Sequence, residues 1–156
     1  MLLSDCGQEH HFFSGDRLYI LKTAAAFDSA HFLAGYNGKC ANLHGHHWVI
    51  EVEAGSETLQ ETGEKRGMVI DFGDLKKAVR ALADSYDHAL IYENGTLKAA
   101  TLAALQDENF RLIAVPYRPT AENFAKAFYE KLTADGLPVQ SVTVYETPDN
   151  SARYEV

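Results

Sequence analysis

Three histidines in the first third of the chain stand at spacings that suit a metal site. His44 and His46 are two residues apart, and His31 precedes them. If the segment after His44 is extended, side chains two positions apart share one face, and a neighbouring strand can bring His31 to that face. Three neutral imidazoles without a fourth protein ligand are typical of a catalytic zinc site, in which one coordination position stays open for water or substrate. The spacing therefore predicts a zinc site formed by His31, His44 and His46.

Cys40 is close enough in sequence to His44 to overhang the open position of such a site. It lies in a polar, glycine-rich loop, and a nearby cation or imidazolium would favour its thiolate form. Two alternatives stay open: Cys40 is a fourth zinc ligand in a closed structural site, or it is a small buried hydrophobic side chain, as most free cysteines are.

A second group of ionisable residues lies further along the chain. Asp87 directly precedes His88, and a carboxylate beside an imidazole can fix its tautomer and raise its basicity. The alternative is a helix-capping or surface pair. Glu146 ends an apolar strand, so it either faces solvent or, if buried, accepts two parallel hydrogen bonds from a guanidine-like edge of a ligand. Glu122 lies near a helix N-terminus, where a carboxylate is stabilised for structural reasons alone.

The remaining histidines and the second cysteine carry less information. His47 points away from His46 in a strand, which favours a surface or packing role. His10 and His11 lie in a polar N-terminal stretch, and Cys6 is expected to have no role. We therefore assign no chemistry to these residues.

Length and composition indicate an ordinary globular chain. With 156 residues it suits a single domain, residues 1–156, with a sizeable core, and 46% of the residues are hydrophobic. The net charge of −8 argues against binding to a nucleic-acid backbone. It does not exclude a small anionic substrate, because a few local cations or backbone N–H groups suffice. No apolar run approaches the ~20 residues that span a bilayer.

The N-terminus and the cysteine content predict the compartment. Residues 1–16 lack the basic region followed by an apolar region that marks a signal peptide, so we expect a loose or strand-joining extension there. Two cysteines do not form a disulfide framework. A cytoplasmic protein is expected, with neither nucleic acid nor membrane as a partner.

The hydrophobic pattern predicts the elements that position the candidate residues. Residues 17–31 are expected to form a strand with His31 near its end. Alternation of apolar and polar residues over 44–54 is typical of a half-buried strand. A polar hairpin loop is expected over 57–65, and a short strand over 67–70.

The second half of the chain is predicted to add the helices and a closing hairpin. Asp71 or its neighbour caps a helix that runs to about Tyr86, and Thr120 caps another that runs to about Thr133. The remaining predicted elements are a helix over 97–106, a strand over 110–115 and a hairpin of residues 139–146 and 152–156. The whole pattern favours an α+β fold in which helices cover one face of a sheet.

Six short motifs occur in an order that resembles a known family. Along the chain they are Phe27-Asp28-Ser29-Ala30-His31, Cys40-x3-His44-Gly45-His46, Val69-Ile70-Asp71-Phe72, Asp87-His88, Pro119-Thr120-Ala121-Glu122-Asn123 and Val144-Tyr145-Glu146-Thr147. Together they resemble the 6-pyruvoyltetrahydropterin synthase / 6-carboxytetrahydropterin synthase family. Each motif is short, but six in the same order over most of the chain are specific.

The resemblance implies a tunnelling fold (T-fold), an antiparallel sheet with two helices on one face. It also implies a homo-oligomer, typically a hexamer of two stacked trimers, in which the sheets of neighbouring subunits join into barrels. The active sites would lie at subunit interfaces, and a monomer would be inactive.

The resemblance also implies a role for each candidate residue. Zinc (Zn2+) would be held by His31, His44 and His46. Cys40 would move protons on the substrate side chain, and Asp87 with His88 would form a second proton-transfer group contributed by the adjacent subunit. Glu146 would anchor the 2-amino-4-oxo edge of a pterin, with Thr120 and Glu122 nearby.

One spacing separates branches of the family. Three residues stand between Cys40 and His44, which resembles the bacterial 6-carboxytetrahydropterin synthases of queuosine biosynthesis, whereas animal-type pyruvoyl enzymes usually have a longer spacer. The resemblance then implies a zinc-dependent lyase that converts 7,8-dihydroneopterin triphosphate to 6-carboxy-5,6,7,8-tetrahydropterin, acetaldehyde and triphosphate. The segment 94–118 is longer than in the most compact members, and we expect it to be a lid or an interface element.

Three alternative functions are kept. The first is a 6-pyruvoyltetrahydropterin synthase, which eliminates triphosphate in tetrahydropterin synthesis. The second is a non-catalytic, zinc-stabilised pterin-binding protein, against which the set of Cys40, Asp87 and His88 argues. The third is an unrelated three-histidine metal enzyme such as a β-barrel oxygenase, where two histidines and a carboxylate are the more usual ligands.

Overall fold

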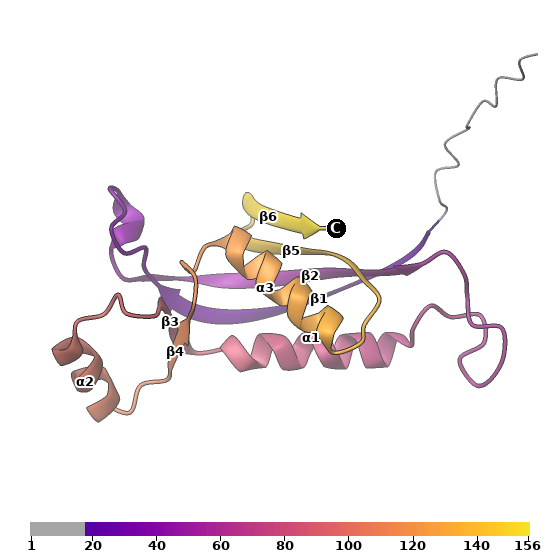
Figure 1. Cartoon of the computed structure of the whole chain (residues 1–156), viewed down its shortest axis with the longest axis horizontal. Helices are drawn as coiled ribbons and strands as arrows, with labels where there is room; N and C mark the ends of the chain where they lie inside the picture. Colours follow the sequence, from indigo (N-terminus) through magenta and orange to yellow (C-terminus); the bar gives the residue numbers. More distant parts are fainter. Residues whose placement is uncertain (1–17) are drawn as a thin grey trace, which may run out of the picture.

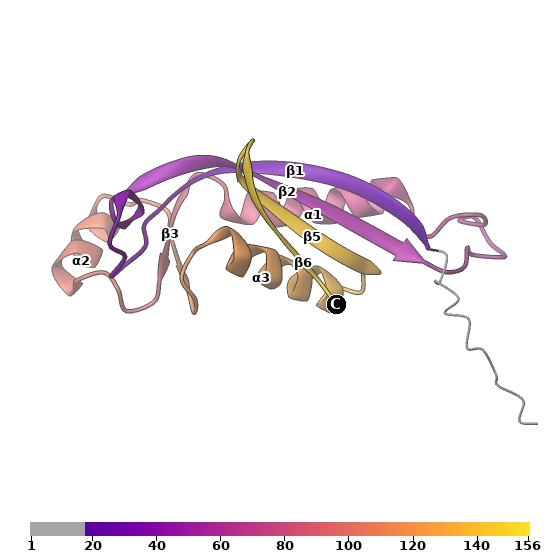
Figure 2. The ribbon, with the colours of Figure 1, turned by 90° about the horizontal axis from the view of Figure 1, so that it is seen from above.

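The computed structural model describes residues 18–156, which form one curled sheet with helices on one face (Figures 1 and 2). The predictions for residues 1–16, including those for Cys6, His10 and His11, lie outside the described residues. Within residues 18–156 the architecture is α+β, as the sequence predicts.

A long antiparallel hairpin forms the centre of the sheet. It consists of β1 (Tyr19–His31) and β2 (His44–Ser56). Their alternating pattern buries one face, where Phe27 lies opposite Trp48, and leaves the other face free of helices. The same register places His31 opposite His44 at the end of the hairpin.

The sheet extends on both sides of this hairpin, in the order β4-β3-β1-β2-β5-β6. On one side β5 (Val139–Thr147) and β6 (Asn150–Glu155) continue the antiparallel pairing, which confirms the predicted closing hairpin. On the other side β3 (Ala89–Glu93) pairs in parallel with β1, and β4 (Leu112–Val115) pairs in parallel with β3. The sheet is therefore mixed, whereas the resemblance implied an antiparallel one, and β3 was missed by the sequence analysis.

The predicted short strand over residues 67–70 is wrong. This segment forms turns and bends, because Gly67 has a left-handed φ of 84° and its N–H donates to the carbonyl group of Gln60. An apolar run of four residues is compatible with a strand, but here Ile70 packs against the edge of the core instead.

Two helices cover one face of the sheet (Figure 2), which gives the core its second layer. They are α1 (Phe72–Tyr86) and α3 (Ala121–Ala134). Asp71 accepts hydrogen bonds from the backbone at the start of α1, and Thr120 does so at the start of α3, which confirms both predicted N-caps. The predicted apolar stripe of α1 is buried, including Leu75 and Val79.

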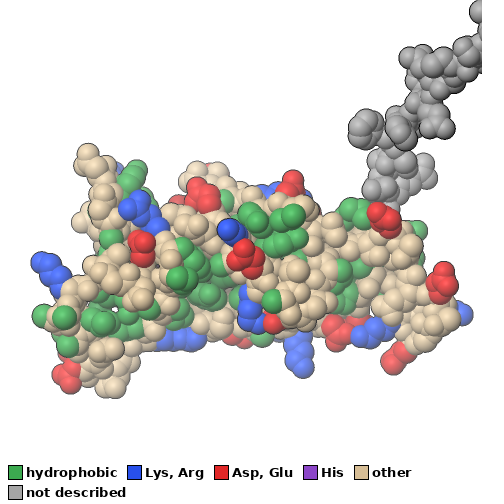
Figure 3. Space-filling view, in the orientation of Figure 1, with side chains coloured by type: hydrophobic (Ala, Val, Ile, Leu, Met, Phe, Trp, Pro, Cys, Tyr) green, Lys and Arg blue, Asp and Glu red, His purple; other side chains and the backbone are tan. Residues whose placement is uncertain are grey.

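The third helix, α2 (Ala99–Asp107), lies apart from these two, at one end of the molecule beyond β3 and β4 (Figures 1 and 2). It has no buried residue, and apolar side chains are exposed at this end of the surface (Figure 3). Both α2 and β4 confirm elements predicted within the segment 94–118. Between residues 18 and 156, none of the helices has the length and apolar character that crossing a membrane requires.

Candidate metal centre

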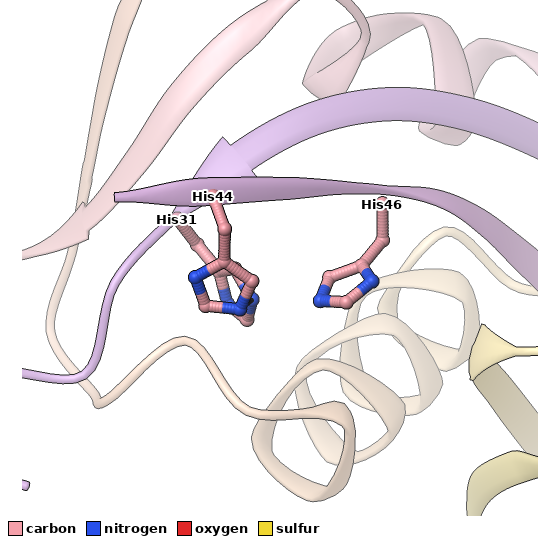
Figure 4. Close-up of side chains that lie close together, drawn as sticks. All are labelled: His31, His44 and His46. Carbon is pink, nitrogen blue, oxygen red and sulfur yellow. Dashed lines mark hydrogen bonds between the residues drawn. The ribbon is translucent and has the colours of Figure 1, made fainter. Parts of the chain in front are cut away.

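The three histidines predicted to bind a metal converge at the end of the central hairpin. His31 comes from β1, and His44 and His46 come from β2; all three rings lie on the helix-covered side of the sheet (Figure 4). One potential ligand atom from each ring lies within 4.8 Å of the others. Within the described residues 18–156, the cluster of ligand atoms consists of these three histidines and includes no thiol. The structure therefore does not favour Cys40 as a fourth ligand.

Gly45 allows the close strand pairing that puts these rings together. A Cβ atom at this position would stand 3.0 Å from the backbone oxygen of Ser29, a distance tighter than nearly all real Cβ contacts. The glycine between the two histidines therefore lets β2 approach β1 while His44 and His46 share one face.

Backbone carbonyl groups orient two of the rings. The Nδ1 atom of His31 is 2.7 Å from the carbonyl oxygen of Pro119, and that of His44 is 2.7 Å from the carbonyl oxygen of Asn42. A carbonyl only accepts, so each Nδ1 carries the proton and each neutral ring presents a bare Nε2. This second layer of hydrogen bonds is the usual means by which proteins fix the tautomer of a metal-binding histidine.

The two bare nitrogens point at each other. The Nε2 atoms of His31 and His44 are 3.1 Å apart, yet neither carries a proton when both rings are neutral. Burial lowers the pKa of His31 to about 4, helped by the neighbouring His44 and His46, so this ring is uncharged at neutral pH. Burial also lowers the pKa of His46, whose Nε2 atom is buried and has no hydrogen-bond partner among the described residues.

A divalent cation fits this arrangement. Zinc lies about 2.0–2.1 Å from histidine nitrogens in tetrahedral sites, which places two ligand nitrogens about 3.3 Å from each other. Three neutral, convergent imidazoles with bare Nε2 atoms provide such a donor set, and a bound cation would satisfy the lone pairs that are otherwise left facing one another.

Aromatic side chains of the core pack against the histidine rings. Trp48 packs edge-to-face against His31 and His46, with ring centroids 5.0 and 5.2 Å away, and Phe124 of α3 packs against Trp48 at 5.1 Å. His31 is only 1% exposed. The ligand geometry therefore depends on the packing between the sheet and α3.

Glu146 of β5 reaches the same centre. Its Oε1 atom lies 3.5 Å from Nε2 of His46 and 3.7 Å from Nε2 of His31, and its side chain is 30% exposed. A half-buried carboxylate at this place keeps some accepting capacity toward a ligand. The structure thus places Glu146 at the edge of the metal centre rather than at an unrelated surface position.

A cavity of about 270 Å³ adjoins the metal centre and collects most of the predicted site residues. Cys40 reaches it from a short 3-10 helix, Lys39–Ala41, and is half-buried. We call it the Cys40 cavity; its lining residues are His31, Leu33, Tyr36, Cys40, Thr120, Ala121, Glu122, Glu146, Asn150, Ser151 and Ala152. Thr120 and Glu122 enter it from the first turn of α3.

Asp87 and His88 do not reach the Cys40 cavity of their own chain. His88 instead lines a larger cavity of about 610 Å³ to which β1, β2, β3 and β4 contribute, together with His46, Leu105, Phe110 and Arg111. We call it the His88 cavity. The predicted pairing within the dyad is present, because Nδ1 of His88 is 2.7 Å from Oδ2 of Asp87.

His47 confirms its predicted surface position. Its side chain is 67% exposed on the helix-free face, and its Nδ1 atom is 2.8 Å from Oδ1 of Asp28. The sequence predicts no role for Asp28, Tyr36 or the carbonyl groups of Asn42 and Pro119. Asp28 and Pro119 stand within the six motifs, which is the one signal that the sequence offers for this group. Backbone acceptors leave no trace in residue type.

Comparisons with known proteins agree with this geometry. The family model described as 6-pyruvoyl tetrahydropterin synthase matches residues 20–156. A Haemophilus influenzae protein named 6-carboxy-5,6,7,8-tetrahydropterin synthase is 40% identical over 133 residues, which cover 83% of this chain and 94% of that protein. An Aquifex aeolicus protein of the same name is 35% identical over 127 residues, covering 75% and 76%.

Solved structures share the fold. An uncharacterized protein from Wolinella succinogenes superposes with a TM-score of 0.74 at 23% identity, covering 89% of this chain and 98% of that one. The 6-pyruvoyl tetrahydropterin synthase of Caenorhabditis elegans gives a TM-score of 0.62 at 24% identity, covering 90% and 96%. At these identities the likeness establishes the fold alone, and it confirms the predicted tunnelling fold of the subunit.

Proposed function

Because the chain belongs to the 6-pyruvoyl tetrahydropterin synthase family, we propose that it is a zinc-dependent lyase that forms 6-carboxy-5,6,7,8-tetrahydropterin from 7,8-dihydroneopterin triphosphate. One water molecule is consumed, and acetaldehyde and triphosphate are the other products. The observation that carries the proposal is the Cys40 cavity, in which one histidine of the metal centre, a thiol and a carboxylate meet.

The choice of the carboxy-forming branch has two supports. Curated relatives that carry the carboxy-forming name are 35–40% identical over most of the chain. The spacer of three residues between Cys40 and His44 is short, as expected for that branch. We place the reaction in queuosine biosynthesis for the same reasons.

We propose that Glu146, Thr120 and Glu122 hold the pterin. Their side chains line one cavity of about 270 Å³. A carboxylate matches the two parallel N–H donors of a 2-amino-4-oxo pyrimidine edge, because it accepts through both oxygens. Bound in this way, the pterin would direct its side chain past Cys40 toward the histidines.

We propose that Cys40 and His88 are the proton-transfer groups. When bound by His31, His44 and His46, zinc supplies Lewis acidity toward the oxygens of the substrate side chain, which acidifies the neighbouring C–H and O–H groups. Cys40 takes or returns a proton on one side of the carbon chain, and His88, oriented by Asp87, does so on the other. Elimination of triphosphate, addition of one water molecule to the resulting side-chain carbonyl group and a retro-aldol-like cleavage then give the products.

The separation of the two cavities supports a shared site. Cys40 and His88 of one chain line different cavities, so a complete site requires His88 from a second copy. We therefore propose a homo-oligomer, a hexamer of two stacked trimers, with each site at a subunit interface. Residues 1–156 act in it as a single domain.

A pyruvoyl-forming synthase is the second candidate, because the family model carries that name. Both reactions would use the same metal centre and the same thiol. The products separate them: a diketo pterin from simple elimination, or a carboxypterin with acetaldehyde.

Product analysis tests the proposal. Zinc-loaded protein is incubated with 7,8-dihydroneopterin triphosphate, and the products are identified by mass spectrometry. The expected products are 6-carboxy-5,6,7,8-tetrahydropterin and acetaldehyde, absent with Cys40→Ala but present with the matched control Cys6→Ala. No turnover by protein that binds one zinc per chain would overturn the enzyme assignment for this substrate.

A further inference from the structure

Arg111 connects the segment 94–118 to the end of α1. It directly precedes β4 and lines the His88 cavity. Its guanidinium group donates to three backbone carbonyl oxygens: Nη1 to Asp87 at 3.0 Å, and Nη2 to Ser85 at 2.8 Å and to Asp84 at 3.4 Å. A planar fork of donors thus holds the last turn of α1 and the residue that follows it.

The backbone conformation at His88 is strained. His88 has a φ of 52°, in the left-handed region that residues with a Cβ atom rarely adopt. Helices commonly end with a glycine in this conformation, but here the position carries an imidazole. Such a conformation persists only where the surrounding contacts hold it.

Four contacts hold the Asp87–His88 dyad in one geometry. The N–H of Asp28 donates to Oδ1 of Asp87 at 2.8 Å, and the N–H of His88 donates to the carbonyl oxygen of Asp28 at 2.7 Å. Asp87 Oδ2 accepts from Nδ1 of His88. Arg111 adds the fourth contact through the carbonyl oxygen of Asp87. The Nε2 atom of His88 is then the free nitrogen of a 79% exposed side chain.

We propose that Arg111 is a positioning residue for His88. It keeps His88 in its left-handed conformation with Nδ1 on Asp87 and Nε2 free for proton transfer. This inference rests on the proposed role of His88 in the reaction. It also gives the segment 94–118 a function, because α2 and β4 bring Arg111 to the dyad.

The charge environment supports this role. The guanidinium group stands at the C-terminal end of α1, where the helix dipole is negative and a cation is favoured. Between residues 18 and 156, no carboxylate oxygen lies within ion-pair distance of Arg111, so its donors serve the carbonyl groups alone. The backbone N–H of Leu90 donates to the carbonyl oxygen of Arg111 at 2.9 Å, which fixes the arginine itself beside β3.

Kinetics test the inference. Arg111→Ala should lower kcat at least tenfold and change KM less than twofold, with zinc content unchanged. The matched control Arg80→Ala, an exposed arginine on α1, should leave both constants unchanged. Arg111→Lys keeps the charge, but its single ammonium nitrogen cannot occupy the positions of both Nη1 and Nη2, so we expect near-wild-type thermal stability with a kcat as low as that of Arg111→Ala. A kcat within threefold of wild type for Arg111→Ala would overturn the inference.

A double-mutant cycle separates positioning from general stability. In a His88→Ala background, Arg111→Ala should lower kcat less than twofold further, because its effect passes through His88. A full additional tenfold loss would contradict the inference.

Imidazole NMR of 15N-histidine-labelled protein gives a readout that does not depend on turnover. The wild type should show His88 as the Nδ1-protonated tautomer, and Arg111→Ala should show a mixture of both tautomers, with Arg80→Ala unchanged. An unaltered His88 tautomer in Arg111→Ala overturns the inference. A wild-type protein without turnover but with the expected tautomer change would instead overturn the proposed function and leave the positioning role intact.

Discussion

The Nε2 atoms of His31 and His44 face each other at 3.1 Å, while both Nδ1 atoms donate to backbone carbonyl groups. Two neutral rings arranged in this way bring lone pairs together, which costs free energy unless a cation lies between them. The backbone-imposed tautomers therefore already present a donor set that suits a metal cation.

Removal of one of the three histidines should weaken metal binding strongly. We expect His44→Ala to weaken zinc binding at least about 100-fold, since even changes in the second layer around a metal cost about 10- to 100-fold. Zinc content after dialysis, measured by mass spectrometry, checks this. His47→Ala serves as the matched control, because His47 points to the opposite face of β2. Full zinc content in His44→Ala would exclude the three-histidine centre.

Thr120 should stabilise the protein through its cap of helix α3. Its hydroxyl group accepts from the N–H of Asn123 at 3.4 Å and it lines the Cys40 cavity. We expect Thr120→Ala to lower the free energy of unfolding by about 1 kcal/mol, whereas Thr120→Ser keeps the cap and most of the stability. Urea unfolding of both variants tests this. Equal loss in the two variants would show that the hydroxyl cap contributes nothing.

Phe124 should be a major contributor to stability. It is fully buried and packs against Trp48, Phe27 and Phe128. We expect Phe124→Ala to lower the free energy of unfolding by about 3–5 kcal/mol, from lost burial and the cavity that remains. Phe110, which is 60% exposed, provides the control Phe110→Ala. The same free energy of unfolding for both variants would contradict the assigned core.

Acid should lower the free energy of unfolding through protonation of Glu53, which lies on the helix-free face of the sheet. The guanidinium group of Arg153, at 2.7 Å, holds the pKa of Glu53 below its usual value of 4.5, and Ser141 adds a hydrogen bond. A depressed pKa in the folded state contributes stability above pH 4.5, and this contribution is lost as the pH falls through the lower, folded-state value. Because both groups are partly exposed, the loss amounts to about 0.5–1 kcal/mol.

Unfolding of Glu53→Gln between pH 3 and pH 7 measures this contribution. The variant should be less stable than wild type near neutral pH, and the difference should shrink toward pH 3. Glu57→Gln, an exposed glutamate, is the control and should follow the wild-type profile. A difference between Glu53→Gln and wild type that stays constant with pH would argue against the ion pair.

Much of the fold was predictable because its signals are local. A largely apolar run marked β1, alternation marked β2, and side-chain oxygens at Asp71 and Thr120 marked the starts of α1 and α3. The segment 67–70 and β3 were misjudged because each is short. A run of four or five apolar residues fits a strand, a turn or a core edge, and only long-range pairing decides among them.

The sequence by itself determined which chemical groups are available: the types and spacings of His31, Cys40, His44 and His46 predict a metal ligand set with a thiol nearby. Tertiary structure alone decided how these groups are oriented. Carbonyl groups of Asn42 and Pro119 choose the tautomers, and Arg111 reaches the dyad from a distant segment. Backbone acceptors are the same for every residue type, and contacts between distant segments form only when the sheet assembles, so neither leaves a pattern in the sequence.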